Sequence, residues 1–293
     1  MPFRTIDPRR TSTRDLHQYI VGSIAPRPIA FVSTLDAEGR ANVAPYSFFN
    51  AFSSNPPILV FSSNRRVSDN TTKDTLANVR ATGECVINLV DYALAQQMAL
   101  ASVEWPHDVS EFDAAGLTPL AADTTKAFRV KESPGQLECK VKDIVTLGEH
   151  GGAGHLIICE VWRLHLREDV IDQRGRIDPQ RLDLVGRLGR SYYVRCSGEA
   201  VFALVQAVQG EAIGFQRLPE QLRHSGVLTG SQLARLAGQS ALPTPQEAAA
   251  ATAQDERLRA CRNRDQQHRY VAELLDSGQV PYALLVASAP LAE

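Results

Sequence analysis

The first two thirds of the chain carries short runs of apolar and polar residues with the period of β-strands. The run Leu137–Lys142 alternates, as expected for an antiparallel strand with one face toward solvent. Ile58–Phe61 and Ile157–Cys159 are continuously apolar, which predicts burial on both faces. Strands are predicted at residues 28–35, 41–48, 57–62, 84–90, 136–145 and 155–166. Several short strands with few helices favour a closed barrel over a doubly wound sheet.

Two helices are predicted among these strands. One runs from about Lys73 to Thr82 and ends at Gly83, and the other begins after Asp91, a plausible N-cap. The loop from Asp36 to Gly39 is typical of a hairpin. The glycine-rich stretch "GEHGGAGH" also indicates a hairpin turn, because it lacks the glycine spacing of a dinucleotide-binding motif before a helix.

The pattern changes after about Val205, where alanine-rich and charged helical sequence begins. Thr229 and Gln232 have the spacing of a capping box, and a long helix is predicted from Thr244 to Gly278. Its apolar stripe is narrow and consists of Leu258, Cys261, Val271, Leu274 and Leu275. We therefore expect a barrel domain at 1–203 and a helical C-terminal extension at 204–293. The long helix is expected to bury little of its surface, and the extension is expected to pack outside the barrel or on a partner subunit.

Composition narrows the possible partners. The chain has 293 residues and a formal net charge of -2, which argues against nucleic acid as the main partner. No apolar run reaches the roughly 18 residues that span a bilayer, and the N-terminus shows no secretory signal. The five cysteines are widely spaced without a CxxC pair, so neither zinc nor a redox dithiol is expected. Reduced, buried cysteines in a cytoplasmic protein are the expectation.

One predicted strand carries an interruption that calls for a chemical reason. Pro45 has no amide hydrogen, so the strand at 41–48 is expected to be kinked there. Ser47, Phe48, Phe49 and Asn50 follow the break. Backbone groups freed from pairing could bind the edge of a flat aromatic cofactor. The alternative is a kinked edge strand with solvated polar groups.

A second segment has the features of an anion site. Ser62 and Ser63 end a buried strand, and Lys73, Asp74 and Thr75 open the following helix. Unpaired amides at a helix N-terminus favour an anion, and a lysine strengthens that preference. A phosphate is the expected ligand. The alternative is ordinary capping by Thr72, which accounts for one threonine but not for the lysine or the serine pair.

Several fragments in order resemble a known family. They are "GSIAPRPIAFVST", "APYSFFNAFSSNPP", "KDTLANVRATGECVINLV", "EFDAAGLTP", "GHLIICEVWRLH" and "GRLGRSYY". Together they resemble the flavin reductase-like, FMN-binding split-barrel family over roughly residues 15–200. The resemblance implies a mainly β fold, a six-stranded Greek-key barrel that dimerises and holds FMN near the dimer interface.

The resemblance also implies flavin contacts at matching positions. They are Ser33 and Thr34 in the "VST" turn, Ser47, Phe48, Phe49 and Asn50 beside the isoalloxazine, Ser62, Ser63, Lys73, Asp74 and Thr75 on the phosphate side, and Arg27 and Arg187. Short members carry Gly-Asp-His before the late strand, where this chain has Gly152-Ala153-Gly154-His155. One step along a strand turns a side chain to the other face. Two interpretations of His155 therefore stay open: it binds the substrate, or it is a structural histidine.

The resemblance implies NAD(P)H-dependent reduction of flavin, with hydride passing from the nicotinamide to the flavin. A partner monooxygenase that receives the reduced flavin is a further expectation. Such chemistry belongs to the cofactors, so no side-chain nucleophile is required. Two alternatives stay open: a non-catalytic flavin-binding or electron-carrier protein, and a specialised flavin oxidase acting on an organic substrate. NADH and NADPH are not distinguished, because the chain has no Rossmann acid or arginine to indicate a choice.

Overall fold

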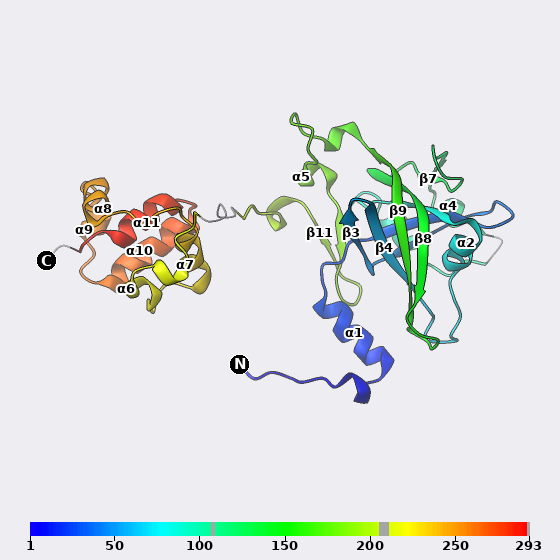
Figure 1. Cartoon of the computed structure of the whole chain (residues 1–293), viewed down its shortest axis with the longest axis horizontal. Coiled ribbons are helices and arrows are strands. Elements are labelled where there is room, and N and C mark those ends of the chain that lie inside the picture. Colours follow the sequence, from blue (N-terminus) through cyan, green and yellow to red (C-terminus); the bar gives the residue numbers. More distant parts are fainter. Residues whose placement is uncertain (107–108, 205–210, 292–293) are drawn as a thin grey trace. The chain divides into compact units, whose positions relative to one another are not determined.

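The structure is a computed structural model that describes residues 1–106, 109–204 and 211–291. The chain divides into two compact units, Met1–Phe202 and Ala203–Glu293 (Figure 1). Val205, where the sequence pattern changes, lies outside the described residues. The two units are described separately below.

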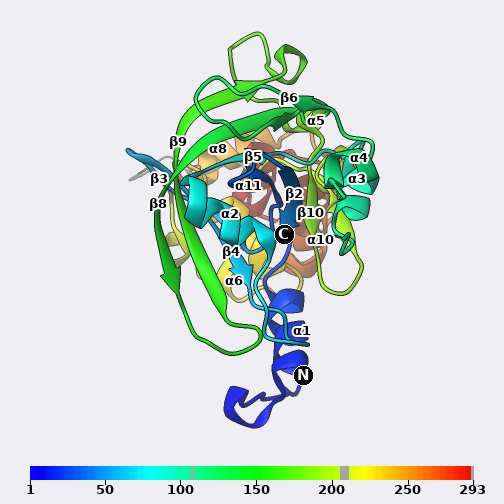
Figure 2. The same cartoon turned by 90° about the vertical axis from the view of Figure 1, so that its right-hand side faces the viewer.

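The first unit is built on one antiparallel sheet in the order β2-β1-β5-β8-β9-β4-β3. Its strands are β1 (Ala30–Leu35), β2 (Ala41–Tyr46), β3 (Phe49–Ser54), β4 (Pro57–Asn64), β5 (Glu84–Asn88), β8 (Gly135–Thr146) and β9 (Gly154–Leu166). The long pair β8 and β9 curves around the side of the sheet (Figure 2). The expected hairpin turns lie between β1 and β2 and between β8 and β9.

The sheet closes on itself through its two edge strands. With every pairing antiparallel, β2 and β3 run in the same direction, and only Ser47 and Phe48 separate them. One continuous segment therefore pairs with β1 through its first half and with β4 through its second half. A sheet whose two edges are consecutive in the chain has to curl into a barrel, which confirms the predicted architecture.

The break in this segment falls later than expected. Pro45 lies inside β2, in register with Phe31, and the pairing changes only at Ser47 and Phe48. Because β2 is an edge strand, a residue without an amide hydrogen is tolerated there. The strand predicted at 41–48 is present as β2, but it ends earlier, at Tyr46. The next strand, β3, was not predicted, and it makes the sheet seven-stranded.

Helices cover the barrel at several places. They are α1 (Thr13–Ser23), α2 (Asp74–Thr82), α3 (Ala95–Ala101), α4 (Glu111–Ala114) and α5 (Pro179–Leu182), with small ladders β6–β7 (Pro119–Leu120, Arg129–Val130) and β10–β11 (Val185–Arg187, Tyr193–Arg195). The helix α2 packs on β1 and β2 and ends at Gly83, whose φ of 70° requires the left-handed conformation that glycine adopts freely. The described helices include none that is both long and apolar enough to cross a membrane.

Both faces of β1 are buried, and each packs into a different cluster. Phe31 belongs to a cluster with Val43 and Met98 on the outer face, while Val32 belongs to the barrel interior with Tyr46 and Phe61. The alternation of a strand therefore decides which residues of β1 and β2 face inward.

The second unit consists of short helices rather than one long one. They are α6 (Glu220–Arg223), α7 (Gly230–Ala237), α8 (Pro245–Ala251), α9 (Glu256–Arg259), α10 (Arg264–Asp276) and α11 (Val280–Ser288). Both predicted capping boxes are present, at Thr229 and Thr244. The predicted single helix from Thr244 to Gly278 was wrong, because Asp255 and Asn263 each accept a backbone N–H bond and begin new helices.

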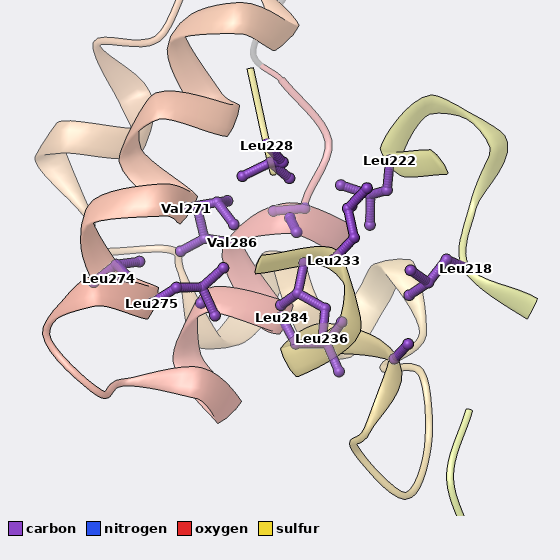
Figure 3. Close-up of a cluster of buried hydrophobic side chains, with 14 of the residues drawn as sticks. Leu218, Leu222, Leu228, Leu233, Leu236, Val271, Leu274, Leu275, Leu284 and Val286 are labelled. Carbon is purple, nitrogen blue, oxygen red and sulfur yellow. The ribbon is translucent and has the colours of Figure 1, made fainter. Parts of the chain in front are cut away.

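This unit also buries far more than a narrow stripe. Its core gathers side chains from α6, α7, α10 and α11, among them Leu222, Leu236, Val271, Leu275 and Val286 (Figure 3). The expectation that the segment from Thr244 to Gly278 would bury little of its surface was therefore wrong. Breaks between α8, α9 and α10 let each helix turn its apolar side inward, which one straight helix with the same residues could not do. That the unit contributes nothing to hydride transfer stays a prediction.

Candidate functional site

Alternation along β2 sends neighbouring side chains to two different places. Tyr46 packs in the barrel interior with a ring-centroid distance of 5.2 Å to Phe61. Pro45 and Ser47 line a cleft on the outer face. The start of α2 and this cleft thus lie on either side of one strand, and most of the predicted site residues belong to one or the other.

The N-terminus of α2 lacks a side-chain cap. Lys73 occupies the N-cap position and makes no capping hydrogen bond through its side chain. The alternative reading, capping by Thr72, is not what the structure shows. The first amides of a helix have no intrahelical partner, and together with the helix dipole they attract an anion.

Lys73 adds positive charge at this helix start. Its Nζ lies 5.1 Å from the centroid of the Tyr46 ring. Burial, and secondarily the nearby Arg66 charge, lower the pKa of Lys73. Arg66 is itself held by Glu104 at 2.7 Å and by the Thr72 carbonyl at 2.8 Å. A partly buried ammonium whose charged form is disfavoured gains most from an anionic partner.

Two buried hydroxyls beside this helix start are without partners. Tyr46 Oη and Ser63 Oγ make no hydrogen bond to any described residue, although only 5% and 1% of their respective residues' surfaces are exposed. Burial raises the pKa of Tyr46 to about 12, an effect that the neighbouring Thr75 and Ser63 hydroxyls oppose. Buried polar groups are nearly always bonded, so such groups indicate a missing ligand or water.

Other predicted phosphate ligands are already engaged. Ser62 Oγ donates to Asn64 Oδ1 at 2.8 Å, and Thr75 Oγ1 donates to Asn42 Oδ1 at 2.9 Å. The Asp74 side chain is exposed and lines a separate hollow with Glu111. Its carboxylate would repel a phosphate, so Asp74 can serve only through its backbone amide.

The adjacent residues of the "VST" turn face opposite ways. Ser33 lies on the outer face, where its hydroxyl bonds to the Phe128 carbonyl and accepts from Asn88 Nδ2 at 3.1 Å. Thr34 faces the interior and accepts from Asn78 Nδ2 at 3.0 Å. Both residues are fully buried, and their side chains join strands and helix within the barrel.

The outer cleft has a volume of about 210 Å³ and mixes apolar and cationic groups. It is lined by Ile29, Pro45, Ser47, Met98, Ser102, Arg187 and Tyr193. Arg187 stacks on Tyr193 with its guanidinium carbon 4.5 Å from the ring centroid and donates to the Tyr193 hydroxyl. This rigid cation beside an apolar floor suits a flat ligand with an electron-rich or anionic edge.

Arg27 is buried behind the cleft and has mainly a structural task. Its guanidinium donates to the carbonyls of Val21, Ile24 and Leu188, and its Nε lies 3.4 Å from Ser47 Oγ. Burial, and then the Arg187 charge, lower its pKa. Arg27 thus ties the end of α1 to the joint between β2 and β3.

The joint and the following strand are open on one side. Phe48 packs edge-on against His17 of α1 with centroids 6.1 Å apart, and Phe49 packs partly against the barrel core. Asn50 is exposed and caps the amide of Ala51 at 2.8 Å. Every residue of β3 after Phe49 is exposed, and α1 has no buried residue.

His155 is not brought to the cleft. It is in register with Ser63, and its side chain faces the interior with only 2% of the residue exposed. Its Nδ1 lies 3.0 Å from Thr146 Oγ1, and burial lowers its pKa with further help from Arg80 and Arg65. Its buried Nε2 makes no hydrogen bond to a described residue, so neither substrate binding nor the structural alternative is settled, and the role of His155 stays a prediction.

Sequence reasoning missed three residues of the site. Tyr46, Arg66 and Tyr193 were not among the predicted site residues. The alternation of β2 would have placed Tyr46 on the side of Ala44, away from Pro45. No sequence signal places Arg66 beside Lys73, because the contact depends on the fold of the intervening loop.

Comparison with known proteins gives a consistent picture. A family model described as flavin reductase like domain matches residues 22–180. An uncharacterised protein of Aquifex aeolicus is 36% identical over 191 residues, which are 65% of this chain and 95% of that protein.

Solved structures agree. Nitrilotriacetate monooxygenase component B from Bacillus cereus is 32% identical with a TM-score of 0.65, over 70% of this chain and 100% of that one. The 2-nitrobenzoate 2-nitroreductase NbaA from Pseudomonas fluorescens is 28% identical with a TM-score of 0.61, over 71% and 99%.

Proposed function

The chain belongs to the flavin reductase-like family, and from that premise we propose that it binds FMN and uses NAD(P)H to reduce flavin. The observation that carries the proposal is the cap-free start of α2 with Lys73 and two unpartnered buried hydroxyls beside it. This set fits a phosphate monoester. A single compact anion site favours FMN over FAD, whose pyrophosphate and adenosine would need more room.

The ring of the flavin would lie in the outer cleft, across β2 from the phosphate. The cofactor supplies the hydride chemistry when bound, and the protein holds the rings and excludes water. Ile29, Pro45 and Met98 offer apolar contact, while Ser47 and the stacked Arg187 offer polar contact at the edge. Of the predicted ligands, Ser33, Thr34 and Arg27 would not contact the flavin; their hydrogen bonds to neighbouring protein groups would hold the residues that line the cleft in place.

We propose that the working form is a homodimer. The cleft's roughly 210 Å³ is smaller than the ~300–1,000 Å³ usual for small-molecule sites, so one chain encloses too little of a flavin. Beside the cleft lie β3, exposed and open along one edge, and α1, without a buried residue. A second copy covering these elements would complete the wall.

The product would be reduced flavin, handed to a separate monooxygenase. This part of the proposal is supported by the likeness to a monooxygenase component B. A cytoplasmic location is proposed with it, because the five cysteines are free thiols, which persist in reducing compartments.

A second candidate is reduction of an organic acid within the same cleft. The likeness to a 2-nitrobenzoate reductase and the stacked guanidinium of Arg187 at the cleft favour it. An arginine held against an aromatic ring is suited to a carboxylate.

One experiment separates the candidates. Purified protein is loaded with FMN, and anaerobic NADH and NADPH oxidation is measured with free FMN and then with 2-nitrobenzoate as acceptor. A flavin reductase oxidises the nicotinamide with free FMN alone, and a specialised reductase requires the organic acid. A protein that binds FMN but oxidises neither nicotinamide would be a flavin carrier, and both enzymatic readings would be wrong.

A further inference from the structure

The inner wall of the anion site contains a residue with no assigned role. Tyr46 Oη and Ser63 Oγ are buried, and neither makes a hydrogen bond of good geometry to a described residue. The groups beside the phenol are the hydroxyls of Ser63 and of Thr75, which lies in the first turn of α2. Leaving such a group unpaired costs as much as its desolvation, so a native protein retains it for a purpose.

We propose that Tyr46 is a phosphate ligand of the bound flavin, donating its hydroxyl proton together with Ser63 from inside the barrel. The inference rests on the proposed FMN site and deepens it by naming what distinguishes FMN from riboflavin. The amides of α2 and Lys73 would approach the phosphate from the helix side, and the two hydroxyls from the opposite side.

The neighbouring bonds support this division. The Thr75 hydroxyl donates a hydrogen bond to Asn42 Oδ1, and the Ser62 hydroxyl donates one to Asn64 Oδ1. Among the predicted hydroxyls at this end of the barrel, Ser63 and the newly assigned Tyr46 keep a proton without an acceptor. A phosphate monoester is an acceptor that fits both.

Burial keeps the phenol a donor rather than a base. It raises the pKa of Tyr46 to about 12, the Asp74 charge adds a smaller effect in the same direction, and Lys73 Nζ lies 5.1 Å from the ring centroid. The phenol is therefore neutral at every working pH and keeps its proton to donate. An ammonium on one side of the ring and a neutral hydroxyl at its tip form an arrangement that prefers a dianion to a neutral ligand.

The test uses Tyr46→Phe and Ser63→Ala in the full chain. Affinities for FMN and riboflavin are measured by flavin fluorescence, and inorganic phosphate is used as a competitor against FMN. Each variant should bind FMN at least about 10-fold more weakly, because hydrogen bonds to charged groups are strong. Riboflavin affinity should stay within about 2-fold, and phosphate should compete less well.

Stability supplies the second readout. Removing an unpartnered hydroxyl should leave the melting temperature of the flavin-free protein unchanged or higher. The matched control is Tyr282→Phe, whose hydroxyl donates to Asp255 Oδ2 at 2.6 Å in the second unit. That variant should melt lower and bind FMN normally.

The outcomes separate this inference from the function it builds on. FMN binding by Tyr46→Phe and Ser63→Ala within about 2-fold of wild type would overturn the inference and leave the flavin site standing. Equal losses for FMN and riboflavin would show that the hydroxyls act through the fold. A wild-type protein that binds no FMN would overturn both.

Discussion

Replacing Lys73 by methionine tests the anion site most directly. Methionine keeps an unbranched stem that can pack over the Tyr46 ring, but it carries no charge. FMN and riboflavin differ only by the phosphate. The ratio of their affinities therefore reports on the phosphate alone.

The expected size follows from two competing effects. Loss of the cation–π contact costs about 0.5–2 kcal/mol, but it affects the free and flavin-bound protein alike and largely cancels in the binding constant. Loss of the charge-assisted bond to phosphate appears only in the complex and amounts to roughly 1.5–3 kcal/mol. Lys73→Met should therefore weaken FMN about 10- to 150-fold and change riboflavin little.

The pH dependence provides an independent check. Burial and Arg66 hold the pKa of Lys73 below its usual value of about 10.4, so the free protein loses this charge earlier than an exposed lysine would. In the proposed site, the FMN phosphate would bind the protonated form of Lys73. Wild-type affinity should thus fall with rising pH from below that value, while Lys73→Arg, which stays charged, should show no such decline.

Titration of the flavin-free protein, followed by fluorescence from pH 7 to 10, measures both effects. Equal weakening of FMN and riboflavin would mean that Lys73 serves the fold. Wild type and Lys73→Arg declining together with pH would mean that another group binds the phosphate.

Three further predictions concern the frame around the site. Burial would raise the pKa of Glu138, but hydrogen bonds from the Thr124 hydroxyl and neighbouring donors outweigh it and lower the pKa to about 2. The ionised carboxylate then contributes ~3 kcal/mol of folding stability at ~1.36 kcal/mol per pKa unit, which is complete above about pH 4.3 and is lost as the pH falls toward 2. In urea unfolding, Glu138→Gln should therefore lose a matching amount of stability at pH 7 and little at pH 2. Burial lowers the pKa of His268, so the second unit should lose stability as pH falls below about 6.5, and thermal melts of His268→Gln should not show that slope. A truncation ending at Phe202 should bind FMN with wild-type affinity, and failure of a soluble truncation to do so would place the second unit in the site.

Local patterns in the sequence predicted most of the barrel. Apolar runs located the strands, because a strand buried on one face alternates apolar and polar residues, and a strand buried on both faces is continuously apolar. The joint at Ser47 and Phe48 was misplaced because Pro45 is a local signal, whereas transfer of pairing from β1 to β4 is a property of the closed sheet.

The second unit shows the opposite failure. Its capping boxes were read correctly at Thr229 and Thr244, since a cap depends on three consecutive residues. The breaks at Asp255 and Asn263 were passed over, although both are good N-cap residues, because the alanine-rich context favours a continuous helix. Whether this segment forms one helix or the three helices α8, α9 and α10 is decided by packing in the core of the second unit.

The site depends on β2 more than any motif suggests. Tyr46 faces the barrel interior, whereas Pro45 and Ser47 face the cleft, because successive residues of a strand point to opposite sides. A flavin bound as proposed, with its ring in the cleft and its phosphate at the start of α2, would have to pass the joint at Ser47 and Phe48. There β2 stops pairing with β1, and the Phe48 carbonyl accepts a hydrogen bond from the Ser62 amide at 2.8 Å. The interruption that closes the barrel is thus also the place where a phosphate on one side and a flat ring on the other can belong to one molecule.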